Sequence, residues 1–248
     1  MCRPLKALPL ILMLALALLG FVTTSCGNGG STKIRVVHAM SNDPGNNLDV
    51  DVNGTKIAPA VVYGSVYPSQ PGGGPAAYIG VPSGSDTIAV FNLNQTTNPV
   101  IANTTLNLSG GTDYTVVLGG SLGDIPNPPT AYLFTDNNAA PPTGKVGFRV
   151  INASVVTPQS GWNVFIYPSG TQIPATPTIS GLLLGQDGPG YIYLTQETSY
   201  AITVAYATGT QVFTQNYAQT TGQVSTLVIK DFPTGSGVEQ FIEMEDVQ

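Results

Sequence analysis

Charge is scarce in this chain, and so are cysteine and histidine. Only 9% of the 248 residues are charged, and the chain contains two cysteines and one histidine. Two cysteines exclude a disulfide-dense scaffold and a cysteine-rich zinc site, and a single imidazole excludes most histidine-based metal clusters. The formal net charge of −6 provides no basic face with which to bind phosphates, so no nucleic-acid partner is expected.

Hydrophobic residues, glycine and proline are plentiful. Hydrophobic residues make up 42% of the chain, which is enough to build a core. The 29 Gly and 20 Pro exceed the usual share without reaching the level that is typical of disorder. The length fits one or two domains of roughly 100–200 residues each.

The N-terminus has the pattern of an export signal. Arg3 and Lys6 precede an uncharged and strongly apolar segment, residues 8–22. The apolar part is shorter than the ~20 residues that a membrane-spanning helix needs, and small residues follow it. We therefore predict a signal peptide at residues 1–25, whose removal would change the net charge from −6 to −8.

The residues before Cys26 resemble a bacterial lipobox, although Thr23 stands where leucine is commonest. The resemblance implies that Cys26 carries a lipid, becomes the first mature residue and anchors the protein to a membrane. The alternatives are an ordinary signal peptide cut near Cys26 and an uncleaved anchor. Cys2 lies in the removed segment, so Cys26 would have no partner for an internal disulfide.

The predicted location is the bacterial cell envelope. Gly27 follows the cysteine where lipoproteins retained in the inner membrane often carry aspartate, so the resemblance favours an outer-membrane lipoprotein. Secretion or a periplasmic location is the alternative. Residues 26–32 are polar and rich in glycine, and we expect them to form a flexible linker.

Beyond residue 31 the apolar residues recur with period 2, and no stretch indicates an amphipathic helix. The segment 48–52 alternates apolar and polar residues and ends at Asn53-Gly54, a strong hairpin signal. Further short strands are separated by clusters of Gly, Pro and Ser. This pattern predicts a β-sandwich or a β-barrel.

The order of these strands returns about 114 residues later. The matched segments are 35–39 with 149–153, 48–52 with 162–166, 88–90 with 202–204, 115–117 with 226–228 and Tyr132-Leu133 with Phe241-Ile242. The acidic tail, residues 239–248, is therefore predicted to be the last strand of the second unit. We predict two tandem immunoglobulin-like antiparallel β-sandwich domains, residues 33–137 and 145–248, joined by a Pro/Gly-rich segment at residues 138–144.

Several segments together resemble DUF4397, a bacterial domain of unknown function. They are residues 34–39, Asp43-Pro44, 48–54, 78–84 and 110–117. The resemblance covers nearly all of residues 33–248 as two copies, the second of which has Asn152 in place of His38. It implies an exported, β-rich envelope protein, and it carries over no catalytic residue.

Asp49 and Asp51 belong to a D-x-D-x-N-G pattern, which begins an EF-hand loop. The twelfth position of such a loop needs a bidentate glutamate, and Ala60 stands there. A β-strand with alternating apolar and polar residues explains the same pattern, and it would point both carboxylates toward water. A weak Ca²⁺ site on Asp49 and Asp51 remains an alternative, and no other metal and no cofactor is expected.

Catalytic signals are few. His38 is the one available imidazole, and no G-x-S-x-G elbow accompanies it, so a structural role at the end of its strand is favoured. The Gly-rich segment 71–75 lacks the Gly-Lys-Ser/Thr of a phosphate loop. Arg35 and Arg149 occupy matching places and can pair within each unit or on its surface.

The resulting functional hypothesis is a non-enzymatic, lipid-anchored envelope protein with a structural, adhesive or ligand-binding role, whose partner is an envelope protein or a glycan. The alternative is a carbohydrate-binding module of a surface polysaccharide system. That alternative requires several aromatic residues to be exposed together on one face, namely Trp162, Tyr167, Tyr191 and Tyr193. Tyr78 and Tyr114 are expected in the core or in cross-strand pairs. An exported hydrolase is the third hypothesis.

Overall fold

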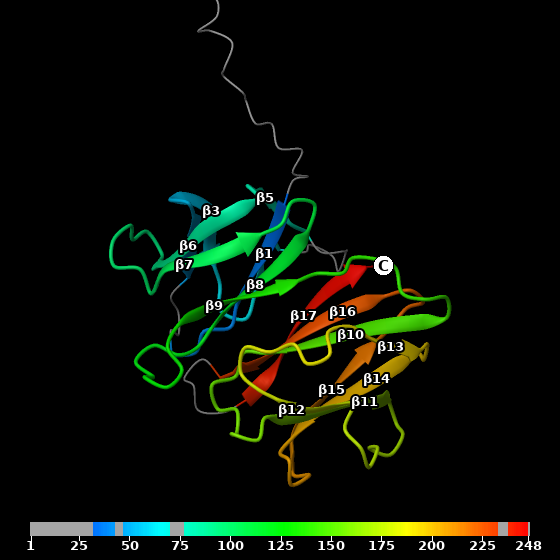
Figure 1. The fold of residues 1–248 in the computed structure, drawn as a ribbon. Coiled ribbons are helices and arrows are strands. Elements are labelled where there is room, and N and C mark those ends of the chain that lie inside the picture. The colour runs from blue at the N-terminus through cyan, green and yellow to red at the C-terminus, as the bar shows by residue number, and fades with distance from the viewer. Residues whose placement is uncertain (1–31, 43–46, 70–76, 233–237, 248) are drawn as a thin grey trace, which may run out of the picture.

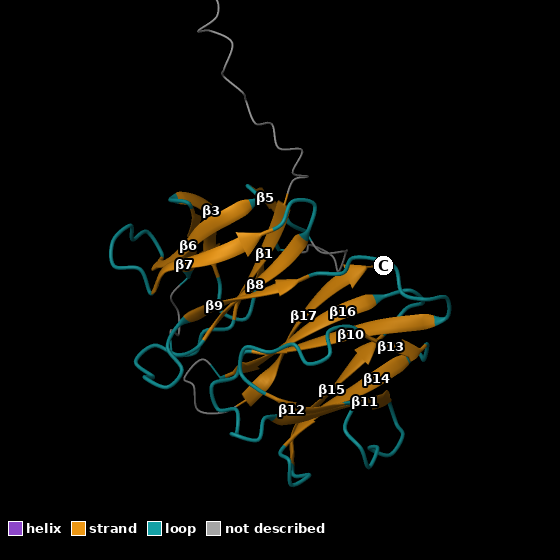
Figure 2. Ribbon diagram, in the orientation of Figure 1, coloured by secondary structure: helices purple, strands orange, loops and turns teal. Residues whose placement is uncertain are grey.

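The computed structural model describes residues 32–42, 47–69, 77–232 and 238–247, and these residues form an all-β protein (Figures 1 and 2). This confirms the β-sandwich fold predicted from the period-2 pattern. The signal segment, Cys26, the linker, Asp43-Pro44 and the Gly-rich segment 71–75 lie outside the described residues. None of the described residues belongs to a helix that is long and apolar enough to cross a membrane.

The strands from β1 to β9, here called the first half, form two sheets. The inner sheet has the order β4 (Val66–Tyr67), β1 (Thr32–His38), β8 (Asp113–Gly119) and β9 (Thr130–Thr135), and β5 (Ile79–Val81) also pairs with β1. The outer sheet has the order β3 (Thr55–Val61), β2 (Leu48–Val52), β6 (Gly84–Asn92) and β7 (Ile101–Leu108).

The strands from β10 to β17, the second half, repeat this arrangement. Their inner sheet has the order β13 (Ile192–Thr195), β10 (Lys145–Asn152), β16 (Val224–Asp231) and β17 (Val238–Val247). Their outer sheet has the order β12 (Ile179–Leu182), β11 (Trp162–Pro168), β14 (Ser199–Ala205) and β15 (Gln211–Ala218). The acidic tail is therefore a strand, as the repeat predicted.

Each half departs from the expected antiparallel pairing at one place. β1 pairs with β8 in parallel, and β10 pairs with β16 in parallel. Parallel neighbours need a long crossover connection, and here the strands of the outer sheet provide it. The alternation of apolar and polar residues does not reveal strand direction, which is why the sequence pattern missed these pairs.

Of the four apolar clusters among the described residues, three form the main cores of the molecule. One fills the first sandwich and another fills the second. The third lies between the two inner sheets and combines residues of both halves, which are Val37, Ala39, Val117, Phe134, Ile151, Ala153, Val228, Ile242 and Met244. In Figure 1 the first half lies above the second, with β9 and β17 between them. Each inner sheet is thus covered on both faces.

The last strands of the two halves correspond in a definite register. Phe134 on β9 pairs with Thr115 on β8, and Met244 on β17 pairs with Thr226 on β16. The two threonines are equivalent, because they pair with the matched arginines of β1 and β10. Phe134 therefore corresponds to Met244.

This register corrects the sequence alignment of the last strand by one residue. Tyr132 corresponds to Ile242 and not to Phe241. Because side chains alternate between the two faces of a strand, a slip of one residue assigns each of them to the wrong face. The corrected register also makes Asp136 and Asp246 equivalent, and both lie at the junction of the halves.

Candidate functional site

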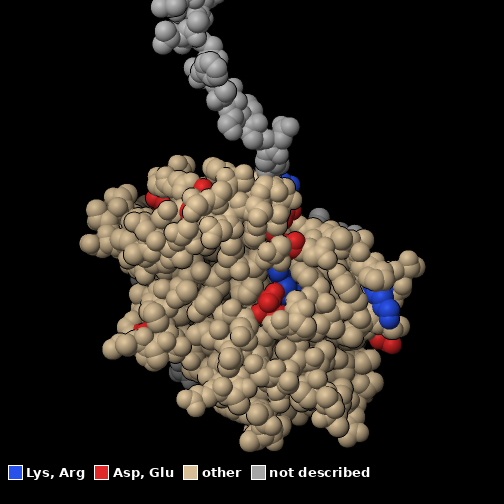
Figure 3. All heavy atoms as spheres, viewed as in Figure 1, with Lys and Arg blue, Asp and Glu red and all other residues tan. Residues whose placement is uncertain are grey.

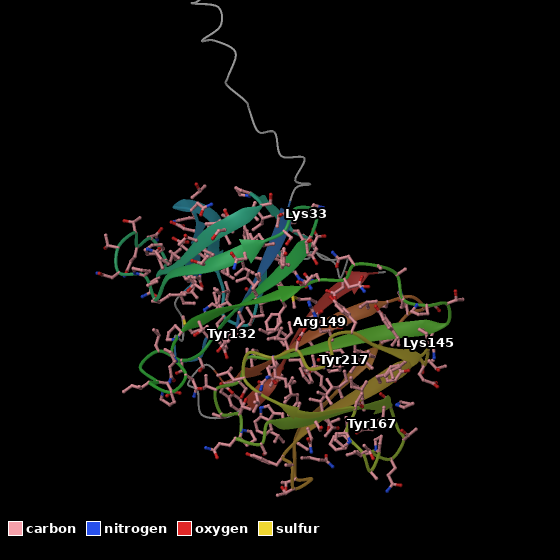
Figure 4. All side chains as sticks on the ribbon, viewed as in Figure 1. Lys33, Tyr132, Lys145, Arg149, Tyr167 and Tyr217 are labelled. Carbon is pink, nitrogen blue, oxygen red and sulfur yellow. The ribbon has the colours of Figure 1, made fainter. Side chains whose placement is uncertain are left out.

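Two arginines lie buried at the junction, and each of them forms a hydrogen bond with an aspartate of the other half. Arg35 of β1 and Arg149 of β10 are both 0% exposed. Arg35 Nη2 donates to Asp246 Oδ1 of the second half at 2.5 Å, and Arg149 Nη2 donates to Asp136 Oδ1, which follows β9, at 2.6 Å. Figure 4 labels Arg149 between the halves. The sequence left these partners open. The structure gives each arginine its shortest ion pair in the opposite half, and Arg35 also lies 3.4 Å from Asp136 of its own half.

A threonine next to each arginine completes the contact. Thr115 Oγ1 accepts a hydrogen bond from Arg35 Nε at 2.8 Å and donates to the carboxylate of Asp136 at 2.8 Å. Its equivalent, Thr226, accepts from the second arginine at 3.0 Å and donates to the last-strand aspartate at 2.5 Å. Each half therefore contributes one arginine, one threonine and one aspartate to the network.

A tyrosine ring covers each guanidinium. The Tyr78 centroid lies 5.3 Å from Arg35 Cζ, and the Tyr191 centroid lies 4.7 Å from Arg149 Cζ, which are distances for cation–π contact. Tyr78 Oη also donates to Asp136 Oδ2 at 2.8 Å. Burial raises the pKa of both tyrosine hydroxyls. The hydroxyls therefore stay protonated and act as hydrogen-bonding groups.

The charges of this junction network hold the two halves together. Burial disfavours the charged form of Arg35, but Asp246 and Asp136 outweigh that effect and the pKa of Arg35 is raised. A buried ion pair adds little net stability over an apolar pair of the same size, but the loss of one partner is costly. The network therefore fixes one arrangement of the two halves.

His38 is fully buried and takes part in contacts within the fold. Its Nδ1 accepts a hydrogen bond from the backbone N–H of Met40 at 3.3 Å. The edge of its ring meets Tyr63, with centroids 5.4 Å apart and an interplanar angle of 88°. A substrate has no access to an imidazole that is 0% exposed. These contacts fit the structural role that the sequence favoured.

Asp49 lies in a place that the sequence did not predict. The alternating pattern turned it toward water, but its side chain is only 1% exposed. It accepts hydrogen bonds from Lys56 Nζ at 2.6 Å, from the N–H of Ala60 at 3.0 Å and from the N–H of Asn94 at 3.1 Å. The backbone of β3 reaches it because Ala60 adopts a positive φ of 52° at an irregular point of the strand pairing.

These contacts leave the Asp49–Asp51 pair poorly suited to Ca²⁺. The Lys56 ammonium already neutralises the Asp49 carboxylate, and Asp51 is not among its partners. No group of three or more acidic, histidine or cysteine side chains suited to a metal occurs in the described part of the chain. The carboxylate of Asp49 is instead a structural acceptor.

We expect Asp49→Asn to make unfolding less sensitive to acid. Burial raises the pKa of Asp49, but the bonds from Lys56, Ala60 and Asn94 outweigh burial and leave it below its usual value. The stability that these bonds provide is present above the pKa of the unfolded chain and is lost as pH falls through the lowered folded pKa. At pH 7 the variant should be about 1–3 kcal/mol less stable than the wild type, and this difference should shrink below pH ~4. Urea unfolding across that range measures it, and a constant difference would contradict the assignment.

The aromatic row that a carbohydrate module requires is not exposed. Trp162 is 1% exposed and Tyr167 is 7% exposed. Tyr167 Oη forms a buried hydrogen bond with Thr203 at 3.0 Å. Tyr191 lies over Arg149 at the junction. Trp162 points into the core of the second sandwich, Tyr167 packs with Phe165 in a smaller cluster on the opposite face of β11, and Tyr191 lies on the arginine.

Among the described residues, two grooves that open at the junction stand out. The larger, about 560 Å³, is lined by Gly64, Ser65, Val66, Ser69, Gln223, Phe241, Ile242, Glu243 and Glu245. The smaller, about 300 Å³, is lined by Asn127, Tyr132, Val155, Thr157, Pro158, Gln159, Leu183 and Leu184. Charged atoms are few on the face shown in Figure 3, and some of them meet between the halves. Two acidic residues, Glu243 and Glu245, line the larger groove.

Fold and junction together define a class of protein, a pair of β-sandwiches fused through a shared core and a buried ionic network. The family model described as a domain of unknown function, DUF4397, matches residues 32–159. The chain belongs to this family, as its resemblance indicated. The match covers the first half and continues through β10 into the second.

Other comparisons add little. No curated protein matches the chain. One solved structure, described as alpha-glucan binding by a streptococcal virulence factor, aligns with 81% of this chain and 93% of its own at 11% identity. Its TM-score is 0.28, and a likeness this low carries no argument about fold or function.

Proposed function

We propose that this protein is a non-catalytic component of a bacterial cell envelope, anchored by a lipid on Cys26, where it presents a rigid body for structural, adhesive or ligand-binding contacts. The observation that carries this proposal is the junction. An apolar core shared by both halves and two exchanged Arg–Asp pairs join the sandwiches. A body with one fixed shape is suited to holding a binding surface at a set distance from an anchor.

The chemistry of the described residues supports a role without catalysis. The only imidazole of the chain is buried, and its contacts are structural. The buried Arg35 and Arg149 are paired with Asp246 and Asp136. Ser154 donates to Asp231 at 2.6 Å, but both side chains are 0% exposed, so this pair is closed to a substrate. A nucleophile needs an open site and an adjacent base.

The anchor is tested by labelling. When the full precursor is expressed in a bacterium that is fed radioactive palmitate, we expect the protein to be labelled and to fractionate with membranes. Cys26→Ser should remove the label. Cys2→Ser is the matched control, since it lies in the predicted signal peptide, and it should be labelled like the wild type. Equal labelling of the wild type and Cys26→Ser, or no labelling of either, would exclude the anchor.

A further inference from the structure

The large apolar side chains that are exposed among the described residues gather at one end of each half. They are Val62, Leu93, Ile125, Leu183, Tyr206 and Phe232. Five of them directly follow β3, β6, β12, β14 or β16, and the sixth lies in the loop after β8. The N–H of Gly64, just after β3, donates to the carbonyl of His38, the last residue of β1, at 2.8 Å. The strand pairings bring the other strands to the end where β1 or β10 stops. These loops and Phe232 are here called the loop end, and the loops are residues 62–65, 93–100, 120–129, 153–161, 183–191 and 206–210.

The loop ends of the two halves meet across the junction. Tyr63 Oη donates to the carbonyl of Asp231 at 2.6 Å. This bond brings the exposed neighbours of these two residues, Val62 and Phe232, to the same side of the molecule. Because β1 starts at Thr32, to which the proposed anchor leads, the loop end lies at the far end of β1 from the anchor.

The smaller groove, of about 300 Å³, opens among these loops. Asn127 and Tyr132 line it from the first half, and loops 153–161 and 183–191 line it from the second. No charged side chain is among the residues that line it. In loops 120–129, 153–161 and 183–191 the charged residues are Asp124 and Asp187, and no lysine or arginine occurs. A charged ligand would lose its hydration without gaining an opposite charge in the lining, so a neutral ligand is favoured.

Two amide side chains supply hydrogen-bonding groups at the groove. Gln159 is exposed, and its amide has no hydrogen-bond partner among the described residues. Asn127 Nδ2 donates to Asp124 Oδ2 at 3.2 Å, which orients the Asn127 amide and leaves its oxygen as an acceptor. An amide both donates and accepts hydrogen bonds, as a sugar hydroxyl does. The polar groups of the lining therefore suit a ligand that is rich in hydroxyls.

Tyr132 supplies an aromatic surface that both halves hold in place. Its ring is half-buried and packs on the backbone of Gly119 in its own half and of Gly185 in the other half. A Cβ at these glycines would lie 3.0 Å and 2.4 Å from ring atoms. Figure 4 labels Tyr132 on β9, where the first half meets the second. The equivalent residue, Ile242, lines the larger groove, so only the smaller groove combines this ring with an uncharged lining.

We propose that the smaller groove binds a neutral saccharide, as one or two sugar rings of a glycan chain. The ligand-binding role of the proposed function is the premise, and a glycan of the envelope is the partner. A sugar ring has apolar C–H faces, which pack on an aromatic ring, and hydroxyl groups, which pair with amides. A volume of about 300 Å³ is at the lower limit of ligand pockets, so the groove holds a short part of the chain. The affinity should be modest, with a Kd of about 10⁻⁴–10⁻³ M.

A glycan array tests the class of ligand. The purified protein should bind at least one neutral oligosaccharide of an array that also carries acidic ones. Calorimetric titration with that oligosaccharide should give the same Kd at about 0.05 M and about 0.5 M NaCl, because no ion pair is screened. Binding of acidic members alone, or no binding of any member up to about 10 mM, would overturn the proposal.

A pair of glutamine variants shows whether the groove is the site. Gln159→Leu should weaken binding by about fivefold or more, because the lining loses an amide. Gln172→Leu is the matched control, since Gln172 is also exposed but lies in the loop after β11, at the opposite end of the second half. This control should bind like the wild type. Equal affinities of the two variants would exclude the groove as the site.

The aromatic ring is tested separately. Tyr132→Phe keeps the ring and should bind within about twofold of the wild type, whereas Tyr132→Leu should weaken binding by about tenfold or more. Thermal unfolding of each variant shows that it is folded. Because Gln159 is exposed, Gln159→Leu stays informative even where Tyr132→Leu does not fold. Equal affinities of folded Tyr132→Phe and Tyr132→Leu would contradict a role for the ring.

The ligand and the anchor are tested by different measurements. A protein that is labelled with palmitate but binds no saccharide would keep the anchor and exclude the ligand. A protein that binds a saccharide but is not labelled would keep the ligand and exclude the anchor.

Discussion

Replacing Asp136 by alanine should lower the free energy of unfolding by about 3–5 kcal/mol. This carboxylate receives Arg149 at 2.6 Å, lies 3.4 Å from Arg35, and accepts hydrogen bonds from Thr115 and Tyr78. Arg149 and Thr115 would stay buried without their acceptor, and buried cations left unpaired are costly. The effect should be felt in both halves, because one arginine belongs to each.

Urea unfolding followed by circular dichroism and by the fluorescence of Trp162 measures this loss. In the wild type both signals should change in a single transition, since the halves share a core. Glu197→Gln, which removes an exposed charge, is the control and should change stability by less than about 0.5 kcal/mol. If Asp136→Ala were as stable as this control, the network would not hold the halves together.

Gly185→Ala should destabilise the protein by about 2–5 kcal/mol. Gly185 has a φ of +77°, and a Cβ built on it would lie 2.4 Å from Cε1 of Tyr132, a side chain of the opposite half. The Tyr132 ring therefore has to shift to admit the new methyl group. The substitution therefore combines backbone strain with a clash across the junction.

A matched glycine separates the cost of the backbone strain from the cost of the clash. Gly190 has a φ of +79°, and nothing lies within 4 Å of its Cβ position, so Gly190→Ala should show only the backbone cost of about 1 kcal/mol. In a double-mutant cycle, Tyr132→Ala should relieve most of the extra cost of Gly185→Ala. Additive effects of these two substitutions would mean that the ring does not pack on Gly185.

The sequence predicted the strands and their repetition because alternation and turn chemistry are local signals. It did not predict how the halves meet, although a signal was present. Val36-Val37 and Val116-Val117 place apolar residues on both faces of a strand, which indicates a sheet covered on both sides. Arg35 and Arg149 were recognised as a matched pair, but no local rule tells which half holds the partner of a buried arginine.

The candidate sites were harder to predict, for two physical reasons. Alternation assumes a regular strand, so the side chain of Asp49 was predicted to be exposed to water. The pairing of β2 with β3 is irregular, however, and the N–H of Ala60 on β3 donates a hydrogen bond to the Asp49 carboxylate. The acidic tail, which contains Glu243 and Glu245, was predicted as a strand, but the repeat was aligned one residue off. Only the strand register shows that they stand where the first half has a leucine and a threonine.

The exchange of partners at the junction has an evolutionary consequence. A unit that carries both an arginine and its matching aspartate at this face is complementary to a copy of itself, as in an isologous dimer. Joining two such units in one chain preserves that contact and removes the requirement that both copies stay identical. In the fused protein each half can thus change its side chains independently of the other, which a dimer of identical chains cannot do.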